Sequence, residues 1–243
     1  MGVPFSARKG KESRESSEQA AVFQSTDPMF SEQFKTLCSR LQYRAEVLNY
    51  KVIGITSAVA GEGKTVSSVN VARNLAATGR KKVLLIDADL RKSDLAHGLK
   101  ITPRPGLAEY LSGGVNLADV VRMNVAPGLS VIPGGMRISS PWDLLVGDRF
   151  RKLLKEVRER YDLVLLDAPP IIPVSDTMAL RELVDGFILV YRLGFTPHPL
   201  FRQLLEEIGE KKLVGVVLNA VEPQPARYYQ RYYGKYYTKQ QDR

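Results

Sequence analysis

Residues 57–65, with the sequence SAVAGEGKT, have the residue types and spacing of a loop that holds phosphate groups. Glycines let backbone N–H groups close around phosphate oxygens, Lys64 supplies a positive charge, and the hydroxyl of Thr65 is suited to magnesium. The complete pattern has glycine six residues before the lysine, where this chain has Ala58. The loop predicts binding of ATP and Mg²⁺. The predicted ATP contacts are Ala60, Gly61, Glu62, Gly63, Lys64, Thr65 and Val66.

Three aspartates follow apolar runs further along the chain. Asp87 and Asp89 lie two residues apart in IDADLR, where both are expected to point the same way at a strand end. Asp167 ends the run LVLLD, the place expected of a magnesium partner beside a phosphate loop. We predict that Thr65, Asp167 and either Asp87 or Asp89 hold the metal. Either Asp87 or Asp89 could accept the proton of a nucleophile, and with Lys64 they form the predicted catalytic set.

The segment 227–243 holds six of the 11 tyrosines in three pairs. They are Tyr228, Tyr229, Tyr232, Tyr233, Tyr236 and Tyr237. No hydrophobic core can use aromatic side chains in so polar and basic a segment. Basic residues alternate with the tyrosines, a pattern that also suits stacking on single-stranded nucleic acid.

The length and composition fit one large packed domain or two small ones, and the charge suggests a nucleotide, a nucleic acid or an acidic lipid surface as the partner. Of the 243 residues, 44% are hydrophobic, and the net charge of +9 suggests a polyanionic ligand such as a nucleotide. The single cysteine, Cys38, excludes an internal disulfide and fits a reducing compartment. Since the sequence has no run of about 20 apolar residues and no apolar signal segment, we expect a cytoplasmic protein.

Short apolar runs alternate with amphipathic segments along most of the chain. Strands are predicted at 51–57, 82–89, 129–135, 161–170, 186–192 and 213–220. Helices are predicted at 28–46, 64–78, 147–160, 176–183 and 199–210, and one or two short helices within 106–122. Because the strands are continuously apolar, they fit a parallel sheet buried on both faces, where ligands bind at the carboxyl ends.

The predicted fold is therefore of the α/β class, with a doubly wound, mostly parallel sheet flanked by helices, as in P-loop NTPases. We predict one such domain at residues 27–221. The polar residues 1–26 are expected to be disordered, and residues 222–243 to form a flexible tyrosine-rich tail.

Four segments together resemble the bacterial tyrosine kinases of polysaccharide biosynthesis and export: GEGKT, VLLIDADLRKSDL, YDLVLLDAPPIIPVSD and DGFILVYRLGFT, followed by GVVLNAV and the tyrosine-rich tail. The resemblance covers residues 28–243 and implies Walker A, A′ and B motifs at 57–65, 83–91 and 163–167. It implies an ATP:protein-tyrosine phosphotransferase that phosphorylates its own six tail tyrosines and so regulates exopolysaccharide polymerisation and export. It also favours Asp87 as the group that accepts the tyrosine proton, which leaves Asp89 with Thr65 and Asp167 as the predicted metal ligands.

The same resemblance implies partners. These are a separate transmembrane activator or co-polymerase, a tyrosine phosphatase and further copies of the chain, with recruitment to the inner face of the cell membrane; no nucleic acid is expected. The chain has Ala60 where the family often has proline, and DAPP where DTPP is commoner. The family's oligomerisation motif, Glu-x-x-Arg-x-x-Arg, reads here as Glu32, Lys35 and Cys38. Because Lys35 lacks the planar arginine fork and Cys38 has no charge, the motif does not specify a ring.

Two alternatives stay open at this stage. Partition-type and cell-division-site ATPases have a similar core with an extra lysine five residues before the phosphate-loop lysine, where this chain has Val59. A nucleic-acid-binding module would use the basic residues that alternate with the tyrosines, Arg227, Arg231, Lys235 and Lys239.

Overall fold

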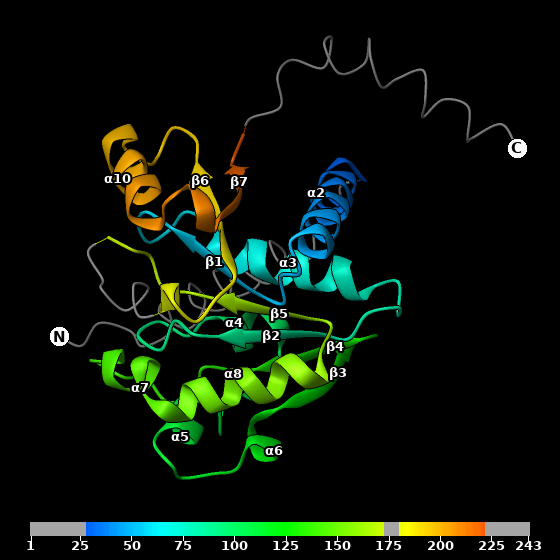
Figure 1. The fold of residues 1–243 in the computed structure, drawn as a ribbon, viewed down its shortest axis with the longest axis vertical. Helices are drawn as coiled ribbons and strands as arrows, with labels where there is room; N and C mark the ends of the chain where they lie inside the picture. The colour runs from blue at the N-terminus through cyan, green and yellow to red at the C-terminus, as the bar shows by residue number, and fades with distance from the viewer. Residues whose placement is uncertain (1–27, 173–179, 222–243) are drawn as a thin grey trace, which may run out of the picture.

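The computed structural model describes residues 28–172 and 180–221, in which a seven-stranded sheet has helices on both faces (Figure 1). The strands are β1 (Val52–Ser57), β2 (Val83–Asp87), β3 (Arg122–Ala126), β4 (Leu129–Ile132), β5 (Leu163–Asp167), β6 (Gly186–Arg192) and β7 (Leu213–Asn219). Their order in space is β3-β4-β2-β5-β1-β6-β7. All neighbours run parallel except β3, which is antiparallel to β4. The predicted α/β fold with a mostly parallel sheet is confirmed.

The helices form two layers. On one face of the sheet lie α2 (Pro28–Val47), α3 (Lys64–Ala76) and α4 (Leu95–Leu99). On the other lie α5 (Leu107–Leu111), α6 (Leu117–Val120), α7 (Trp142–Val146), α8 (Asp148–Arg160) and α10 (His198–Ile208), while the 3₁₀ turn η1 (Glu210–Lys212) leads into β7. Within the described ranges, no helix has both the length and the apolar character needed to cross a bilayer.

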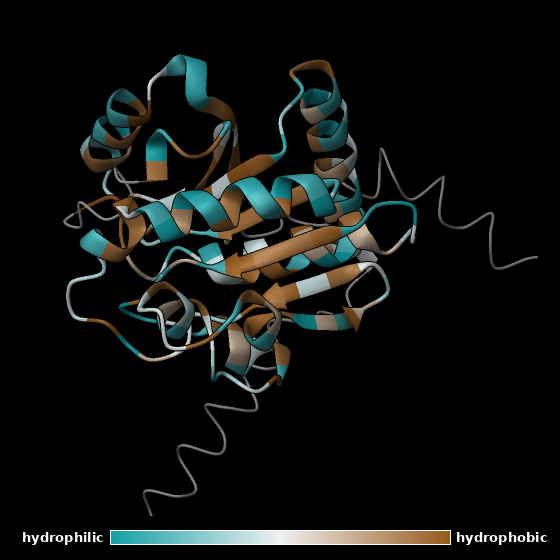
Figure 2. Cartoon of the chain, turned by 60° about the horizontal axis from the view of Figure 1, so that its bottom comes forward, coloured by the Kyte–Doolittle hydropathy of each residue, from teal (hydrophilic) through white to brown (hydrophobic). Residues whose placement is uncertain are grey.

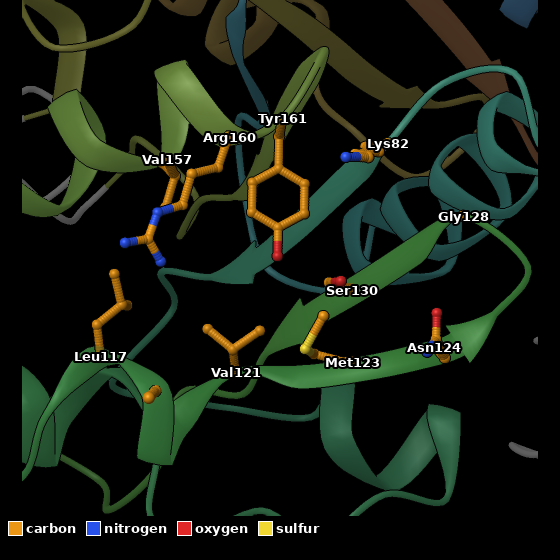
Figure 3. Close-up of a pocket in the computed structure, with 11 residues that line it drawn as sticks. Lys82, Leu117, Val121, Met123, Asn124, Gly128, Ser130, Val157, Arg160 and Tyr161 are labelled. Carbon is orange, nitrogen blue, oxygen red and sulfur yellow. The ribbon is translucent and has the colours of Figure 1, made fainter.

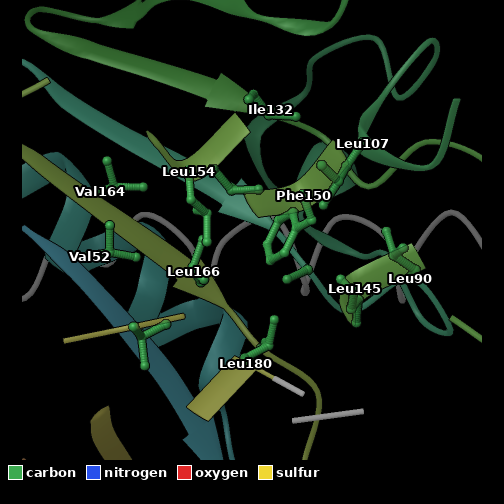
Figure 4. Packing of buried hydrophobic residues seen from close by; sticks show 14 of the residues in the cluster. Val52, Leu90, Leu107, Ile132, Leu145, Phe150, Leu154, Val164, Leu166 and Leu180 are labelled. Carbon is green, nitrogen blue, oxygen red and sulfur yellow. The ribbon is translucent and has the colours of Figure 1, made fainter. Parts of the chain in front are cut away.

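Two hydrophobic cores hold the layers together because alternate strand residues face opposite sides. In β2, Leu84 and Ile86 point toward α8, whereas Leu85 points toward α3, and all three are fully buried. Figure 4 shows Phe150 of α8 packed among the side chains of the first core. Figure 2 shows hydrophobic strands behind the hydrophilic outer face of α8. Each fully buried large apolar side chain contributes about 1.5–3 kcal/mol relative to exposure.

Several elements differ from the sequence-based predictions. The antiparallel strand β3 and the short helices α4 and α7 were not predicted. Residues 106–122, where one or two short helices were predicted, hold the two short helices α5 and α6. The strand predicted at 82–89 ends at Asp87, so the prediction that Asp87 and Asp89 share a strand end is wrong. Asp89 lies in the following loop, where its N–H turns back to Asp87 Oδ1 at 3.2 Å. The predicted tails and half of the predicted helix 176–183, residues 176–179, lie outside the described residues.

Candidate active site

The carboxyl ends of three adjacent strands, β2, β5 and β1, bring the predicted site residues together. Asp87 and Asp167 are direct partners in the register of β2 and β5, and Asp167 is also paired with Ile55 of β1. Neighbouring strands lie about 4.8 Å apart, so the loop that follows β1 begins beside Asp167, with Asp87 one strand further across the sheet.

The phosphate loop connects β1 to α3 and has the backbone conformation that its glycines allow. Gly61 and Gly63 have φ angles of 87° and 91°, in the left-handed region that L-residues avoid. A Cβ atom on Gly63 would also lie 2.2 Å from Asn219 Nδ2. Lys64 begins α3, so the helix N-terminus and its unpaired N–H groups open onto the loop. This is the arrangement that binds phosphate.

Lys64 lies among carboxylates and is 8% exposed. Its Nζ is 3.2 Å from Asp89 Oδ2. Burial alone would lower the pKa of Lys64, but the charges of Asp167, Asp89 and Asp87 outweigh burial and raise it. The ammonium is therefore held in its charged form at the position where phosphate charge would enter.

Asp87 is fully buried, and both of its oxygens accept hydrogen bonds. Ser93 Oγ donates to Oδ2 at 2.7 Å, and the N–H of Asp89 donates to Oδ1. Burial, and then the charge of Asp167, raise the pKa of Asp87 well above its usual value. A carboxylate in this environment accepts a proton more readily than one in water.

Asp167 has one satisfied and one unsatisfied oxygen. Its Oδ1 accepts a 3.0 Å hydrogen bond from Ser68 Oγ, while its buried Oδ2 has no hydrogen-bond partner among the described residues. Burial raises the pKa of Asp167, with Lys64 and the hydroxyl of Thr65 acting in the opposite direction. An unpaired buried carboxylate oxygen is costly and marks a place for a cation.

These residues fit Mg²⁺. The ion prefers oxygen ligands, and Thr65, Asp89 and Asp167 supply a hydroxyl and two carboxylates beside the phosphate loop. In the part of the chain that the structure describes, no cluster of three or more His, Cys, Asp and Glu side chains forms a metal cage. Mg²⁺ does not need such a cage, because the ion keeps several waters and takes other ligands from substrate phosphates.

The remaining predicted ATP contacts lie in or next to the loop. Ala60 and Gly61 are in the loop itself, and Val66 packs its side chain partly buried against the α3 side of the core, so only its backbone is available to the ligand. Glu62 is fully buried and hydrogen-bonds to its own loop and to Thr196. The sequence did not single out the partners Ser68, Ser93 and Thr196. Only Ser68 had a signal, since it lies one helical turn after Lys64.

A hollow lies at the opposite end of the sheet from these residues. Its volume is about 420 Å³, and Figure 3 shows side chains that line it, with Tyr161 among them. Lys82 precedes β2 and Gly128 precedes β4, so this hollow is at the amino ends of the strands. None of the predicted site residues lines it, and in a doubly wound sheet ligands bind at the carboxyl ends.

The residues at the oligomerisation motif are divided between the surface and the core. Glu32 and Lys35 form an exposed ion pair at 3.3 Å on α2. Cys38 is 5% exposed, and its Sγ donates to Val71 O at 3.6 Å. Burial raises the pKa of the Cys38 thiol to about 12, so it is an unreactive core side chain. The six tail tyrosines lie outside the described residues.

The chain is similar in sequence and in fold to known proteins. The protein family described as AAA domain matches residues 50–210. The tyrosine-protein kinase CpsD of Streptococcus agalactiae is 34% identical over 200 residues, which cover 81% of this chain and 85% of CpsD. In the solved structure of the BceF tyrosine kinase domain, 92% of that chain superposes on 90% of this one, with 30% identity and a TM-score of 0.77.

Some relatives are much longer. The EpsB protein of Ralstonia solanacearum is 35% identical over 199 residues, but the chain spans only 26% of its length.

Proposed function

The chain belongs to the bacterial tyrosine-protein kinases, and we propose that it transfers the γ-phosphoryl group of ATP to tyrosine hydroxyls, its own tail tyrosines among them. The proposal rests chiefly on the arrangement of residues at the carboxyl ends of β2 and β5. There Asp87 and Asp167 are buried side by side next to Lys64, and Asp167 Oδ2 has no hydrogen-bond partner among the described residues. Such a site is stabilised by a cation and a nucleotide.

ATP binding follows from the phosphate loop. Backbone N–H groups of residues 60–66 and the N-terminus of α3 hold the β- and γ-phosphates, and Lys64 neutralises part of their charge. The Thr65 hydroxyl, Asp89 and Asp167 Oδ2 hold Mg²⁺ in our proposal. The metal supplies further neutralisation of the phosphate charge.

Asp87 is the proposed base. A tyrosine hydroxyl has a pKa of about 10 and is a poor nucleophile when protonated. The carboxylate of Asp87 accepts the phenolic proton as the oxygen approaches the γ-phosphate, and its raised pKa favours this proton transfer. Ser93 and the N–H of Asp89 fix the orientation of the carboxylate. Positioning and charge neutralisation supply most of the rate, as is general for phosphoryl transfer.

The tail is proposed to reach a neighbouring molecule. The sequence has Pro223 and Pro225 ahead of the first tyrosine pair, and proline favours an extended chain, so we propose transfer between molecules rather than within one. Each phosphate adds about −1.5 to −2 charges to a basic tail, so phosphorylation would repel it from bound ATP. A mixing experiment tests this: an active chain lacking residues 227–243 should phosphorylate the tail of a full-length Lys64→Met chain.

The cellular role is proposed from the relatives. CpsD is named a tyrosine-protein kinase, and ExoP of Rhizobium meliloti, 37% identical over 175 residues, is named a succinoglycan biosynthesis transport protein. We propose that this chain acts in the cytoplasm at the inner face of the membrane, with a transmembrane activator, a tyrosine phosphatase and further copies of itself, and regulates exopolysaccharide export. This chain lacks the extra lysine of the partition-type ATPases, because Val59 occupies that position.

Mass spectrometry of the full-length chain tests the proposal. The protein is produced in a host without other tyrosine kinases, as the wild type, as Lys64→Met and as the exposed control Lys155→Met. We expect phosphotyrosine on the wild type and the control and none on Lys64→Met. Undiminished phosphotyrosine on Lys64→Met would overturn the proposal.

A further inference from the structure

The carboxylate of Glu62 is in an unexpected place. Glu62 lies between the two glycines of a loop that binds negatively charged phosphates, yet its side chain is negatively charged and fully buried. A buried charge is costly unless it is hydrogen-bonded or paired. The carboxylate must therefore have partners that outweigh both burial and repulsion by the nucleotide.

The partners of Glu62 come from its own loop and from the connection that follows β6. Its Oε2 accepts a 2.6 Å hydrogen bond from the N–H of Val59. Its Oε1 accepts hydrogen bonds from Thr196 Oγ1 and, at 3.4 Å, from the N–H of Arg192. Thr196 is itself 5% exposed. The side chain thus joins the phosphate loop to a segment 130 to 134 residues away in sequence.

Two further hydrogen bonds hold the carbonyl groups of the same loop. Arg192 Nη1 donates to Gly61 O at 3.0 Å, and Asn219 Nδ2, at the end of β7, donates to Glu62 O at 2.8 Å. The guanidinium of Arg192 lies over the ring of Phe195, at 4.9 Å from its centroid, which restricts its movement.

These contacts decide where the loop N–H groups point. In a trans peptide the C=O and the next N–H point in opposite directions. When Gly61 O and Glu62 O are held toward β6 and β7, the N–H groups of Glu62 and Gly63 are turned away from those strands. Those N–H groups belong to the loop that receives phosphate oxygens.

We propose that Glu62 and Thr196 are positioning residues that hold the phosphate loop in its phosphate-binding conformation before ATP arrives. This inference rests on the proposed function, because it requires that the loop binds a nucleotide. Glu62 is then not an ATP contact through its side chain. The Glu62–Thr196 hydrogen bond also couples the phosphate loop to residues 192–197, so a change in this connection changes nucleotide affinity.

Calorimetry with Mg-ADP on the full-length chain tests the proposal. Thr196→Val removes the hydroxyl at nearly constant volume, Thr196→Ser keeps it, and Thr102→Val is a matched control at an exposed threonine. We expect Thr196→Val to raise the Kd for ADP at least tenfold, while Thr196→Ser and Thr102→Val stay within about twofold of the wild type. Rescue by serine separates the hydrogen bond from mere packing.

A double-mutant cycle with Glu62→Gln keeps the test independent of any one variant. Since both changes break the same link, the double variant should bind ADP no more than about twofold more weakly than Glu62→Gln alone. Wild-type affinity in Thr196→Val, an equal loss in Thr196→Ser, or fully additive losses would each overturn the proposal. Failure of the wild type to bind ADP would overturn the proposed function as well, so the two failures are distinguishable.

Discussion

The two ends of the parallel sheet both hold buried or half-buried carboxylates, but the pKa values of these carboxylates are shifted in opposite directions at the two ends. At the amino end, Asp185 accepts hydrogen bonds from both Nη atoms of Arg158 at 2.9 Å and from the N–H groups of Lys51 and Val52 at 2.7 Å. Burial alone would raise the pKa of Asp185, but these hydrogen bonds outweigh burial and lower it. At the carboxyl end, Asp87 and Asp167 crowd together, and burial raises the pKa of both.

The carboxylate at the amino end serves stability, whereas the two at the carboxyl end are suited to a functional site. Asp185 is satisfied by the protein itself, so its charge stabilises the fold. Asp87 and Asp167 are left with like-charge repulsion, and Asp167 Oδ2 lacks a hydrogen-bond partner among the described residues, so this end is destabilised until ligands bind. Clusters of strained, titratable groups are typical of functional sites. Mutations of these carboxylates at the two ends should therefore have opposite effects on the stability of the ligand-free protein.

The largest expected effect is on catalysis at the carboxyl end. Asp87→Asn removes the proposed base, so transfer to tyrosine should fall by about 10²-fold or more, while Mg-ATP binding persists. Phosphotyrosine formation over time and calorimetry with Mg-ATP measure the two effects separately. Asp143→Asn, at an exposed aspartate of α7, serves as the control. If Asp87→Asn loses metal-dependent nucleotide binding altogether, Asp87 belongs with the metal ligands and our division of roles is wrong.

The next largest effect is on stability at the amino end. Asp185→Asn leaves Arg158 without its carboxylate and weakens the bonds to two backbone N–H groups, so the free energy of unfolding should drop by about 2 kcal/mol. The value is below that of a fully buried pair, because the side chains of Arg158 and Asp185 keep 31% and 22% exposure. Urea unfolding measures it. The Kd for ADP of the folded variant should stay at the wild-type value; a large change would mean that the two ends are coupled.

Local patterns in the sequence are enough to predict Lys64, Asp87 and Asp167 as site residues. Asp87 and Asp167 end continuous apolar strands, and Lys64 opens the helix after the loop that follows another such strand. Parallel strands place these positions at one edge of the sheet. The partners of the loop could not be predicted in this way. Thr196 and Asn219 meet Glu62 across 134 and 157 residues, and no short-range pattern records a contact at such separation.

The missed elements have physical reasons as well. The strand β3 has the sequence RMNVA, which alternates polar and apolar residues only over Arg122–Val125, too short a run to stand out. Met123 is 72% exposed, so the strand is held by pairing with β4 rather than by burial of an apolar face. A second local sign was Pro127-Gly128, a turn signal immediately before β4. The helices α4 and α7 are five residues each, too short to show a helical period.

A third, smaller effect concerns the pH dependence of stability without ligands. The pKa of Asp87 is higher in the folded than in the unfolded protein. Its contribution to stability is therefore fully present below the pKa of the unfolded state and is lost as the pH rises through the pKa of the folded state. Asp185, with a lowered pKa, contributes stability that is lost as the pH falls. At neutral pH, Asp87→Asn should therefore stabilise the ligand-free protein by about 1 kcal/mol.

Thermal unfolding from acid to neutral pH tests the contrast between the two carboxylates. The melting temperature of Asp87→Asn should exceed that of the wild type at neutral pH and approach it in acid. Asp185→Asn should show the reverse, with its deficit greatest at neutral pH. Parallel pH profiles for the two variants would contradict the assignment of opposite pKa shifts.

The smallest effect is expected at a second carboxylate of the amino end. Asp162 Oδ2 accepts a 2.7 Å hydrogen bond from the N–H of Lys82, as Asp185 does from Lys51 and Val52. Asp162, however, is exposed and has no arginine partner among the described residues. Water can replace its hydrogen bond, so Asp162→Asn should cost about 0.5 kcal/mol or less in urea unfolding. A loss as large as that of Asp185→Asn would show that position at the amino end, rather than burial and the arginine, makes a carboxylate important for stability.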